Sequence, residues 1–339
     1  MENKDQILGS NPILKVENLS IAFKTDTGVY PAVEGVDFEV YEGEILAIVG
    51  ESGAGKSALT ASFARLLPRN GKIAGGKIFF KGKDILALDE KGLRKIRGSE
   101  IAYVFQDPMT SLNPYLRIST QLIEVLRLHL GVNKSEARKT AINLLEKVHI
   151  PDAEKRIDSF PFELSGGMRQ RVMIAMAIAC NPKILIADEP TMALDVTIAA
   201  QILELISELN AKNKTSTVLI THDLGVVAGI AERVIVLYAG RIFEAGRIGE
   251  VFSSPANPYT KGLLQSIPNP ADGRQKEPEQ IPGAPPRLDE IKAGCRFAPR
   301  CQYAEEVCFQ EEPKLYKISP SHSSRCHFAE KIHKSSQAA

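Results

Sequence analysis

Short apolar runs alternate with helical patterns along most of this sequence, beginning at Leu14. Runs that are apolar on both faces cover residues 44–49, 101–105, 183–188 and 216–221. Such runs are typical of parallel strands that are buried under helices on both sides of a sheet. The alternation therefore predicts an α/β protein built around a parallel sheet.

The strand signal disappears between Leu116 and Leu164. In this region apolar residues recur three or four positions apart, first over 122–128 and again over 141–148. This spacing places them on one face of an α-helix. We therefore expect a helical insert in the sheet domain, over about residues 107–180.

The composition changes after Ile267. Prolines recur from Pro268 to Pro286, which indicates an extended linker over residues 268–287. A cysteine-rich segment follows over residues 288–330, and a polar tail begins at about Lys331. We expect His322 and His327, which flank Cys326, to be surface residues.

Composition and charge exclude some functions. The chain has 339 residues, with 42 Lys and Arg against 41 Asp and Glu, so no global positive field favours binding to nucleic acid. The first fifteen residues lack the apolar core of a signal peptide. No stretch approaches the roughly 20 apolar residues that span a bilayer. Any role at a membrane is therefore expected to come through a partner.

The strongest local motif is a glycine-rich loop of the form G-x-x-x-x-G-K-[ST]. It follows a predicted strand and precedes a predicted helix over 58–67, which is the context that a phosphate-binding loop requires. Backbone N–H groups and the helix N-terminus attract phosphate oxygens. Lys56 is expected to reach the β- and γ-phosphates, and the Ser57 hydroxyl to bind Mg²⁺. The predicted nucleotide-binding residues are Gly50, Glu51, Ser52, Gly53, Ala54, Gly55, Lys56, Ser57 and Ala58.

An acid pair ends the predicted strand at 183–188. Asp188 is expected to hold Mg²⁺, and Glu189 to act as the base that polarises an attacking water. Gln106 and His222 each follow another predicted strand. Because the carboxyl ends of parallel strands carry the ligand site of an open sheet, both residues are candidates to contact the γ-phosphate or the water, and Gln106 also to bind Mg²⁺.

The segment 164–171 (LSGGMRQR) provides a second anion site, because Ser165, Gly166 and Gly167 open a predicted helix. This segment resembles the signature sequence of ABC ATPases. The order of phosphate loop, Gln106, signature, acid pair, Asp195 and His222 also resembles that family over about residues 14–267. The resemblance implies a RecA-like core, an N-terminal antiparallel β subdomain and the helical insert.

Further roles follow from the resemblance alone. In ABC proteins the signature closes on a nucleotide held by a partner subunit, so that two chains enclose two ATP molecules. The loop 193–195, with Asp195, would join the two sites. Phe23 resembles the aromatic residue that stacks on adenine, with Tyr30 as the alternative. Met192 stands where relatives carry a small polar residue, and we expect this departure to affect no catalytic atom.

A finer resemblance concerns the transported substrate. The segments 105–114, 193–197 and 257–260 are similar to the ATPases of oligopeptide and dipeptide importers, and the cysteine pattern resembles their dipeptide-type D subunit. This implies a paralogous second ATPase subunit, two transmembrane permeases, an extracytoplasmic peptide-binding protein and a peripheral location on the cytoplasmic face of the inner membrane. Nickel, glutathione or another small solute stays an alternative cargo, and a soluble ABC ATPase stays an alternative function.

The cysteine-rich segment is too short to bury a core of its own, so that a metal or a covalent link is expected. Cys295, Cys301, Cys308 and Cys326 are separated by 5, 6 and 17 residues. Disulfides, a zinc site and no metal at all are alternatives, although no short knuckle spacing favours zinc. Four thiolates can also hold a [4Fe–4S] cluster, and the resemblance to the dipeptide-type family implies such a cluster here.

Overall fold

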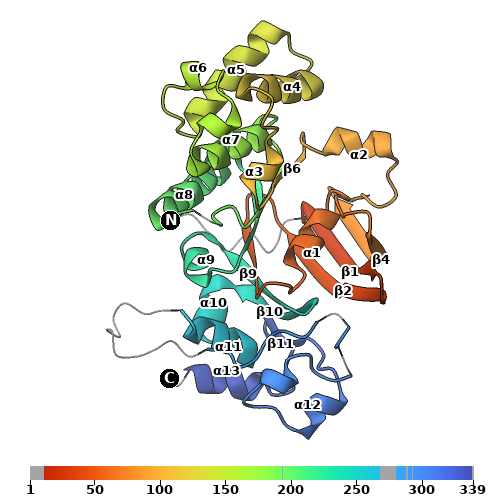
Figure 1. Ribbon diagram of the computed structural model, residues 1–339. Helices are drawn as coiled ribbons and strands as arrows, with labels where there is room; N and C mark the ends of the chain where they lie inside the picture. Colours follow the sequence, from red (N-terminus) through yellow and green to blue (C-terminus); the bar gives the residue numbers. More distant parts are fainter. Residues whose placement is uncertain (1–10, 193, 268–279, 288, 292, 338–339) are drawn as a thin grey trace. The chain divides into compact units, whose positions relative to one another are not determined.

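The computed structural model describes residues 11–192, 194–267, 280–287, 289–291 and 293–337. Within it the chain forms two compact units that each combine distant segments. The first consists of residues 1–13, 40–44 and 87–220, and the second of residues 14–39, 45–86 and 221–339. Many of the elements of both are labelled in Figure 1.

The first unit contains parallel strands that lie in the order β8, β7, β6. In the register, Ile186 of β7 pairs with Tyr103 of β6 and with Val218 of β8. Every residue of β7 and β8 is buried, as expected for runs that are apolar on both faces. The bounds are Ile101–Val104 for β6, Ile184–Asp188 for β7 and Ser216–Thr221 for β8.

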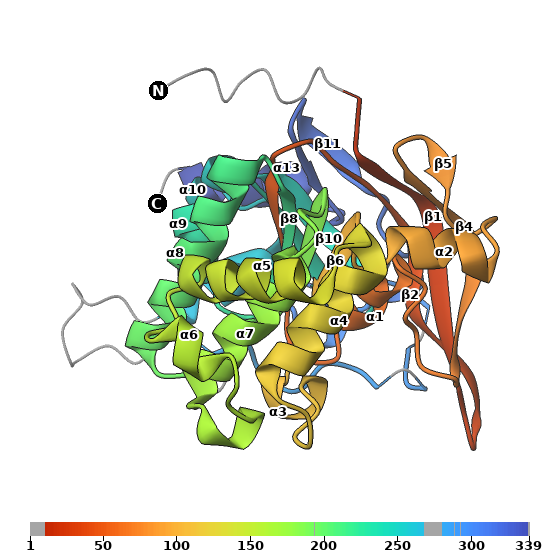
Figure 2. The same ribbon diagram turned by 90° about the horizontal axis from the view of Figure 1, so that it is seen from above.

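Helices make up the rest of this unit, and α4, α5 and α7 pack against one another (Figures 1 and 2). Buried Leu122 and Leu126 of α4 and Leu145 of α5 are the apolar positions at helical spacing. Gly131 ends α4 in the left-handed conformation, and Asn133 begins α5 with a capping box. The helices are α2 (Glu90–Ile96), α3 (Pro108–Ser111), α4 (Ile118–Leu130), α5 (Lys134–Lys147), α6 (Ala153–Arg156), α7 (Gly166–Ile178) and α8 (Val196–Asn213), with a 3-10 turn at Pro161–Glu163.

The second unit holds an antiparallel sheet in the order β2, β1, β4, β5. Its other strands lie in the order β3, β9, β10, β12, β11, where only the β3–β9 pair is parallel. The bounds are β1 (Leu14–Thr25), β2 (Gly28–Val40), β3 (Ile45–Val49), β4 (Gly71–Phe80), β5 (Lys83–Asp84), β9 (Arg233–Tyr238), β10 (Arg241–Arg247), β11 (Tyr316–Ser319) and β12 (His322–Ser324).

The helices of the second unit are short, and most of them belong to its C-terminal half. They are α1 (Lys56–Ser62), α9 (Leu224–Ile230), α10 (Ile248–Ser253), α11 (Pro258–Gln265), α12 (Glu306–Gln310) and α13 (Ala329–Gln337), with a 3-10 turn at Ala298–Arg300.

The C-terminal segment is built into this unit through a shared core. Strand β12 pairs with β10, and Tyr238, Phe243, Tyr259 and Phe297 form a cluster of ring contacts. Ile281, which precedes the last prolines, packs against the same core. The first part of the expected linker, residues 268–279, lies outside the described residues.

The expectation that His322 is a surface residue is wrong. Its side chain is 1% exposed, and Nε2 lies 2.6 Å from Oε1 of Glu244, which is itself fully buried. The pairing of β12 with β10 carries His322 into the core, where a polar ring needs a partner. The sequence spacing around Cys326 contained no signal for this pairing.

No helix in the described part of the chain is both long and apolar enough to cross a membrane.

Candidate functional site

The phosphate-loop sequence forms a tight turn between β3 and α1. Gly50 has φ 150°, and a Cβ there would lie 2.1 Å from the carbonyl oxygen of Leu237. Gly55 has φ 100°, and a Cβ there would lie 2.6 Å from the oxygen of Ala32. Both positions therefore require glycine. The helix that follows begins at Lys56 and ends at Ser62, earlier than the predicted range of 58–67, because Arg65 takes a left-handed conformation and Pro68 follows.

Lys56 folds back over this loop. Its side chain is buried, and Nζ donates hydrogen bonds to the carbonyl oxygens of Gly50 (2.7 Å) and Glu51 (3.0 Å). Ser52, Gly53 and Ser57 are exposed. The Lys56 ammonium and the exposed loop backbone can bind an anion. The Ser57 hydroxyl at the helix start can bind a cation that accompanies this anion.

Glu51 of the loop has partners that the sequence did not indicate. Its backbone N–H donates to the hydroxyl of Tyr259 (2.9 Å). Its carboxylate accepts two hydrogen bonds from the guanidinium of Arg300, at 2.7 and 2.9 Å. An acidic residue within an anion-binding loop was the sequence feature that could have suggested a cationic partner.

Two other predicted residues lie in the second unit. His222 follows β8 and is exposed, and the next residue, Asp223, caps α9 by accepting from Gly225 N. Phe23 is half-buried on β1, and its ring lies over Gly71 of β4, where a Cβ would be 2.8 Å from the ring. The sheet thus leaves one side of Phe23 accessible, as stacking on a base requires.

The acid pair lies at the carboxyl end of β7 in the first unit. Asp188 is 4% exposed and accepts a 2.7 Å hydrogen bond from the hydroxyl of Tyr103. Glu189 has φ 45°, a left-handed conformation that is rare for a residue with a side chain. Strain of this kind is concentrated at functional sites.

Gln106 is brought to the acid pair as predicted from the strand ends. Its Nε2 lies 3.2 Å from Oε2 of Glu189 and 2.8 Å from the sulfur of Met192. Met192, the departure from the family pattern, thus lies in contact with a predicted catalytic residue through its thioether, and its effect on catalysis stays a prediction. The turn from Glu189 to Met192, closed by a backbone hydrogen bond of 3.1 Å, produces this contact.

The second anion site lies at the start of α7. Ser165 caps the helix by accepting from Met168 N at 3.3 Å, and both Ser165 and Gly166 are exposed. At Gly167 a Cβ would lie 2.7 Å from Cγ2 of Ile198. Asp195 is exposed and caps α8 by accepting from Ile198 N at 2.9 Å. Ala193, the first residue of the predicted joining loop, lies outside the described residues.

The four C-terminal cysteines influence one another electrostatically. Burial, with a smaller contribution from the charges of neighbouring thiols, raises the pKa of Cys295 to about 11 and that of Cys326 to about 12. Backbone N–H groups near Cys295, Cys301 and Cys326 oppose these shifts by hydrogen bonding to the sulfurs. All four thiols are free of disulfides. In the described residues no group of three or more His, Cys, Asp or Glu side chains is arranged to hold a metal ion.

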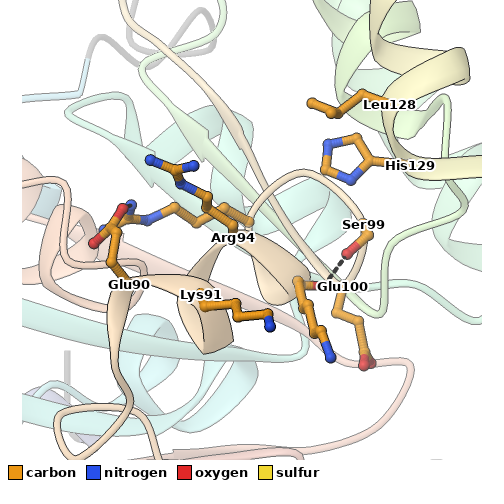
Figure 3. A pocket seen from close by; sticks show the side chains of 9 residues that line it. Glu90, Lys91, Arg94, Ser99, Glu100, Leu128 and His129 are labelled. Atoms are coloured by element: carbon orange, nitrogen blue, oxygen red, sulfur yellow. Dashed lines mark hydrogen bonds and ion pairs between the residues drawn. The ribbon is translucent and has the colours of Figure 1, made fainter.

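A groove of about 1270 Å³ lies between α2 and the end of α4 (Figure 3). In Figure 3, Lys91 and Arg94 lie on one side, and Leu128 and His129 on the other. The ring of His129 packs over Gly98, where a Cβ would lie 3.0 Å from its Nε2. The lining residues, which include four Lys or Arg and two Glu, are Glu90, Lys91, Arg94, Lys95, Arg97, Ser99, Glu100, Leu128 and His129.

Comparison with known proteins agrees with this geometry. Residues 33–192 match the family described as ABC transporter, and residues 243–308 match the C-terminal region of oligopeptide/dipeptide transporters. A solved ATP-binding cassette, a dimer in a post-hydrolysis state bound to ADP and Pi, is 31% identical with a TM-score of 0.63, over 69% of this chain and 98% of that chain. The fold and site thus define an ABC-type ATPase, which confirms the predicted α/β ABC fold.

Curated relatives show which group of ABC transporter ATPases this chain resembles in sequence. The oligopeptide transport ATP-binding protein OppD of Bacillus subtilis is 51% identical over 91% of this chain and 87% of its own length. OppD of Haemophilus influenzae is 49% identical over 93% of this chain and 97% of its own length. This chain belongs to the OppD-type family of ABC transporter ATP-binding proteins.

Proposed function

We propose that this chain is the ATP-hydrolysing subunit of an importer for dipeptides or oligopeptides. The observation that carries the proposal is the presence of both matched regions in one chain, the cassette at 33–192 and the peptide-transporter C-terminal region at 243–308. The names of the OppD relatives support peptides as the cargo.

The bound nucleotide is ATP with Mg²⁺. Backbone N–H groups of Gly50–Ser57 and the Lys56 ammonium bind its phosphates, and Phe23 stacks on the adenine. Ser57, Asp188 and Gln106 would bind the Mg²⁺. This ion would neutralise negative charge on the phosphates. The mostly buried Asp188, held by Tyr103, and the exposed Ser57 hydroxyl are suitable oxygen donors.

Hydrolysis proceeds by in-line attack of water on the γ-phosphorus. The Glu189 carboxylate accepts a proton from the water while the water oxygen bonds to the γ-phosphorus. The bond between the γ-phosphorus and the β-phosphate oxygen then breaks and releases ADP. His222 and Gln106 orient the water and the γ-phosphate. The contact between Gln106 and Glu189 supports this pairing of roles.

A second ATPase subunit, a paralogue of this chain, completes each site. Ser165, Gly166 and Gly167 bind the γ-phosphate of the partner's ATP, and Asp195 lies at the junction between the two sites. Support comes from the exposure of Ser165, Gly166 and Asp195 and from the dimeric state of the solved cassette. An exposed helix N-terminus is suited to binding an anion carried by another molecule.

Two permease subunits hold the ATPase at the cytoplasmic face of the inner membrane, and an extracytoplasmic binding protein delivers the peptide to them. We place the permease contact on the helical insert and the groove beside α2 (Figure 3), where Lys91, Arg94 and Lys95 face solvent-accessible space. An acidic cytoplasmic segment of a permease would complement this charge.

The four C-terminal cysteines, Cys295, Cys301, Cys308 and Cys326, hold a [4Fe–4S] cluster in this proposal. The donor set fits, because the sulfurs of Cys295, Cys301 and Cys326 accept backbone N–H groups of the kind that stabilise cluster sulfurs. Anaerobic purification with iron and sulfide analysis tests this, and stoichiometric zinc would contradict it.

The experiment that tests the function is peptide uptake by proteoliposomes containing the permeases, this chain and its paralogue. We expect uptake of a labelled tripeptide to require ATP on the side of the membrane that the ATPases face. We expect Lys56→Ala to abolish this uptake. ATP hydrolysis that is stimulated only by nickel or glutathione would contradict peptides as the cargo. Failure of this chain to copurify with any permease would remove the transport assignment.

A further inference from the structure

The phosphate loop carries an acidic side chain although its ligand is an anion. Glu51 directly follows the first glycine of the loop, and its own carbonyl oxygen accepts from the Lys56 ammonium. Like charges a few Å apart repel appreciably in a partly buried site, where the effective dielectric is well below that of water. A Glu51 carboxylate without a counter-charge would therefore weaken polyphosphate binding.

The counter-charge comes from the C-terminal segment. Arg300, at the end of a 3-10 turn between Cys295 and Cys301, pairs with both carboxylate oxygens of Glu51. The separation along the sequence is 249 residues. Paired, parallel N–H···O bonds of this type are among the strongest that a side chain makes.

The guanidinium is fixed by further partners. Nε donates to the carbonyl oxygen of Pro282 (2.8 Å), Nη2 also to that of Gly283 (3.3 Å), and Nη1 also to the hydroxyl of Tyr238 (3.2 Å). With the two bonds to Glu51, these contacts match the five N–H donors of an arginine. The side chain is 6% exposed, so its charge is poorly screened by solvent.

The backbone of Glu51 is held by the same region. Its N–H donates to Tyr259, whose ring packs on Tyr238 and Phe297 at centroid distances of 4.6 and 5.3 Å. Burial raises the pKa of the Tyr259 phenol, so that this hydroxyl stays neutral. The first residue after Gly50 is therefore fixed at both its backbone and its side chain by residues beyond position 237.

We propose that Arg300 is a positioning residue for ATP binding, which holds and neutralises Glu51 so that the C-terminal segment completes the phosphate loop. This inference rests on the proposed assignment of Gly50–Ser57 as the phosphate site. It gives the region matched to peptide transporters a direct part in nucleotide binding.

The chain offers a matched control in Arg296. Its side chain is also 6% exposed and lies in the same segment, but it pairs with Glu34 of β2 and with the carbonyl oxygen of Ala239. Arg296→Gln therefore removes a buried ion pair between the C-terminal segment and the β subdomain without touching Glu51.

The experiment measures binding of a fluorescent ATP analogue with Mg²⁺, together with KM and kcat, on the full chain. We expect Arg300→Gln to weaken binding and raise KM about tenfold with kcat nearly unchanged, the size of effect expected for one uncompensated charge near a multiply charged ligand. Arg296→Gln should stay within about twofold of the unaltered chain, because among the residues that the structure describes Arg296 shares no hydrogen-bond or ion-pair partner with Glu51 or Arg300.

The double variant Glu51→Gln with Arg300→Gln separates the proposal from a general loss of structure. Removing the carboxylate removes the repulsion, so binding should recover to within about threefold of the unaltered chain. Glu51→Gln alone leaves Arg300 as an added positive charge, and its affinity should not fall. This last test stands even if Arg300→Gln alone cannot be purified.

Three results would overturn the inference: normal affinity in Arg300→Gln, an equal loss in Arg296→Gln, or no recovery in the double variant. Lys56→Ala distinguishes the underlying assignment. If Lys56→Ala binds ATP normally, the assignment of Gly50–Ser57 as the phosphate site fails. If Lys56→Ala loses ATP binding but Arg300→Gln keeps it, only the role of Arg300 is contradicted.

Discussion

The hydroxyl of Tyr103 donates a 2.7 Å hydrogen bond to Oδ2 of Asp188. The two residues lie on the neighbouring parallel strands β6 and β7, with Asp188 at the carboxyl end of its strand. A carboxylate with 4% exposure needs such a partner, because burying an unpaired charge is costly. Tyr103 thus holds the proposed Mg²⁺ ligand in place from the adjacent strand.

Removing the Tyr103 hydroxyl should destabilise the protein. We expect Tyr103→Phe to lower the free energy of unfolding by about 1.5–3 kcal/mol, the range for a hydrogen bond to a charged group. Urea denaturation measures the change. Tyr115→Phe is the control, because Tyr115 is 88% exposed and its loss should change little. Equal effects of the two substitutions would contradict this role.

The Glu189 carboxylate should be needed for hydrolysis and dispensable for binding. We expect Glu189→Gln to bind ATP with unchanged affinity while turnover falls about 10²- to 10⁴-fold, the range for loss of a general base. The amide is isosteric with the carboxylate and can occupy the same left-handed backbone position. Phosphate release assays measure turnover, with the exposed Glu204→Gln on α8 as control. Normal hydrolysis by Glu189→Gln would remove Glu189 as the base.

A negative charge at the start of α7 should block pairing of subunits. Gly166 has room for a side chain, because the nearest atom to an added Cβ is Cδ2 of Leu194 at 3.8 Å. Gly166→Glu should therefore fold and bind ATP normally, yet fail to form the ATP-dependent dimer, because the carboxylate would repel the partner's γ-phosphate. Size-exclusion chromatography in the Glu189→Gln background measures the dimer. A dimer that persists would place the second anion site elsewhere.

The ion pair of Arg138 and Asp158 predicts a dependence of stability on pH. A bidentate hydrogen bond from Arg138, at 2.9 and 2.6 Å, lowers the pKa of Asp158 below its ordinary value of 3.8. The stabilisation is present above the unfolded pKa and is lost as the pH falls through the folded one. Both side chains are over a third exposed, so Asp158→Asn should cost only about 0.5 kcal/mol at pH 7.

The cost of the same substitution should shrink as the pH falls towards the folded pKa of Asp158, because the stabilisation by the ion pair is lost there. Thermal unfolding of Asp158→Asn and the unaltered chain at pH 7 and at pH 3 compares the two conditions. A difference that grows on acidification would contradict the assignment of the pH dependence to this pair.

The buried strands and the phosphate loop were predictable because each depends on a local pattern. Apolar runs located β6, β7 and β8 to within a residue, and glycine spacing located a turn where Gly50 and Gly55 leave no room for a Cβ. The contact between Gln106 and Glu189 followed from the rule that parallel strands end at one edge.

Partners far apart in sequence could not be predicted in this way. Nothing near His322 indicated that β12 would carry it against the buried Glu244, and nothing near Arg300 indicated Glu51. The contact between Met192 and Gln106 could not be predicted either, because the sequence does not show how tightly the turn after Glu189 closes. Such pairings depend on tertiary structure, which local periodicity does not encode.

The 249 residues between Glu51 and Arg300 also bear on how the protein is made. During synthesis the loop leaves the ribosome long before its arginine partner. On the role proposed for Arg300, a chain that stops before residue 300 leaves Glu51 without its counter-charge and binds ATP more weakly.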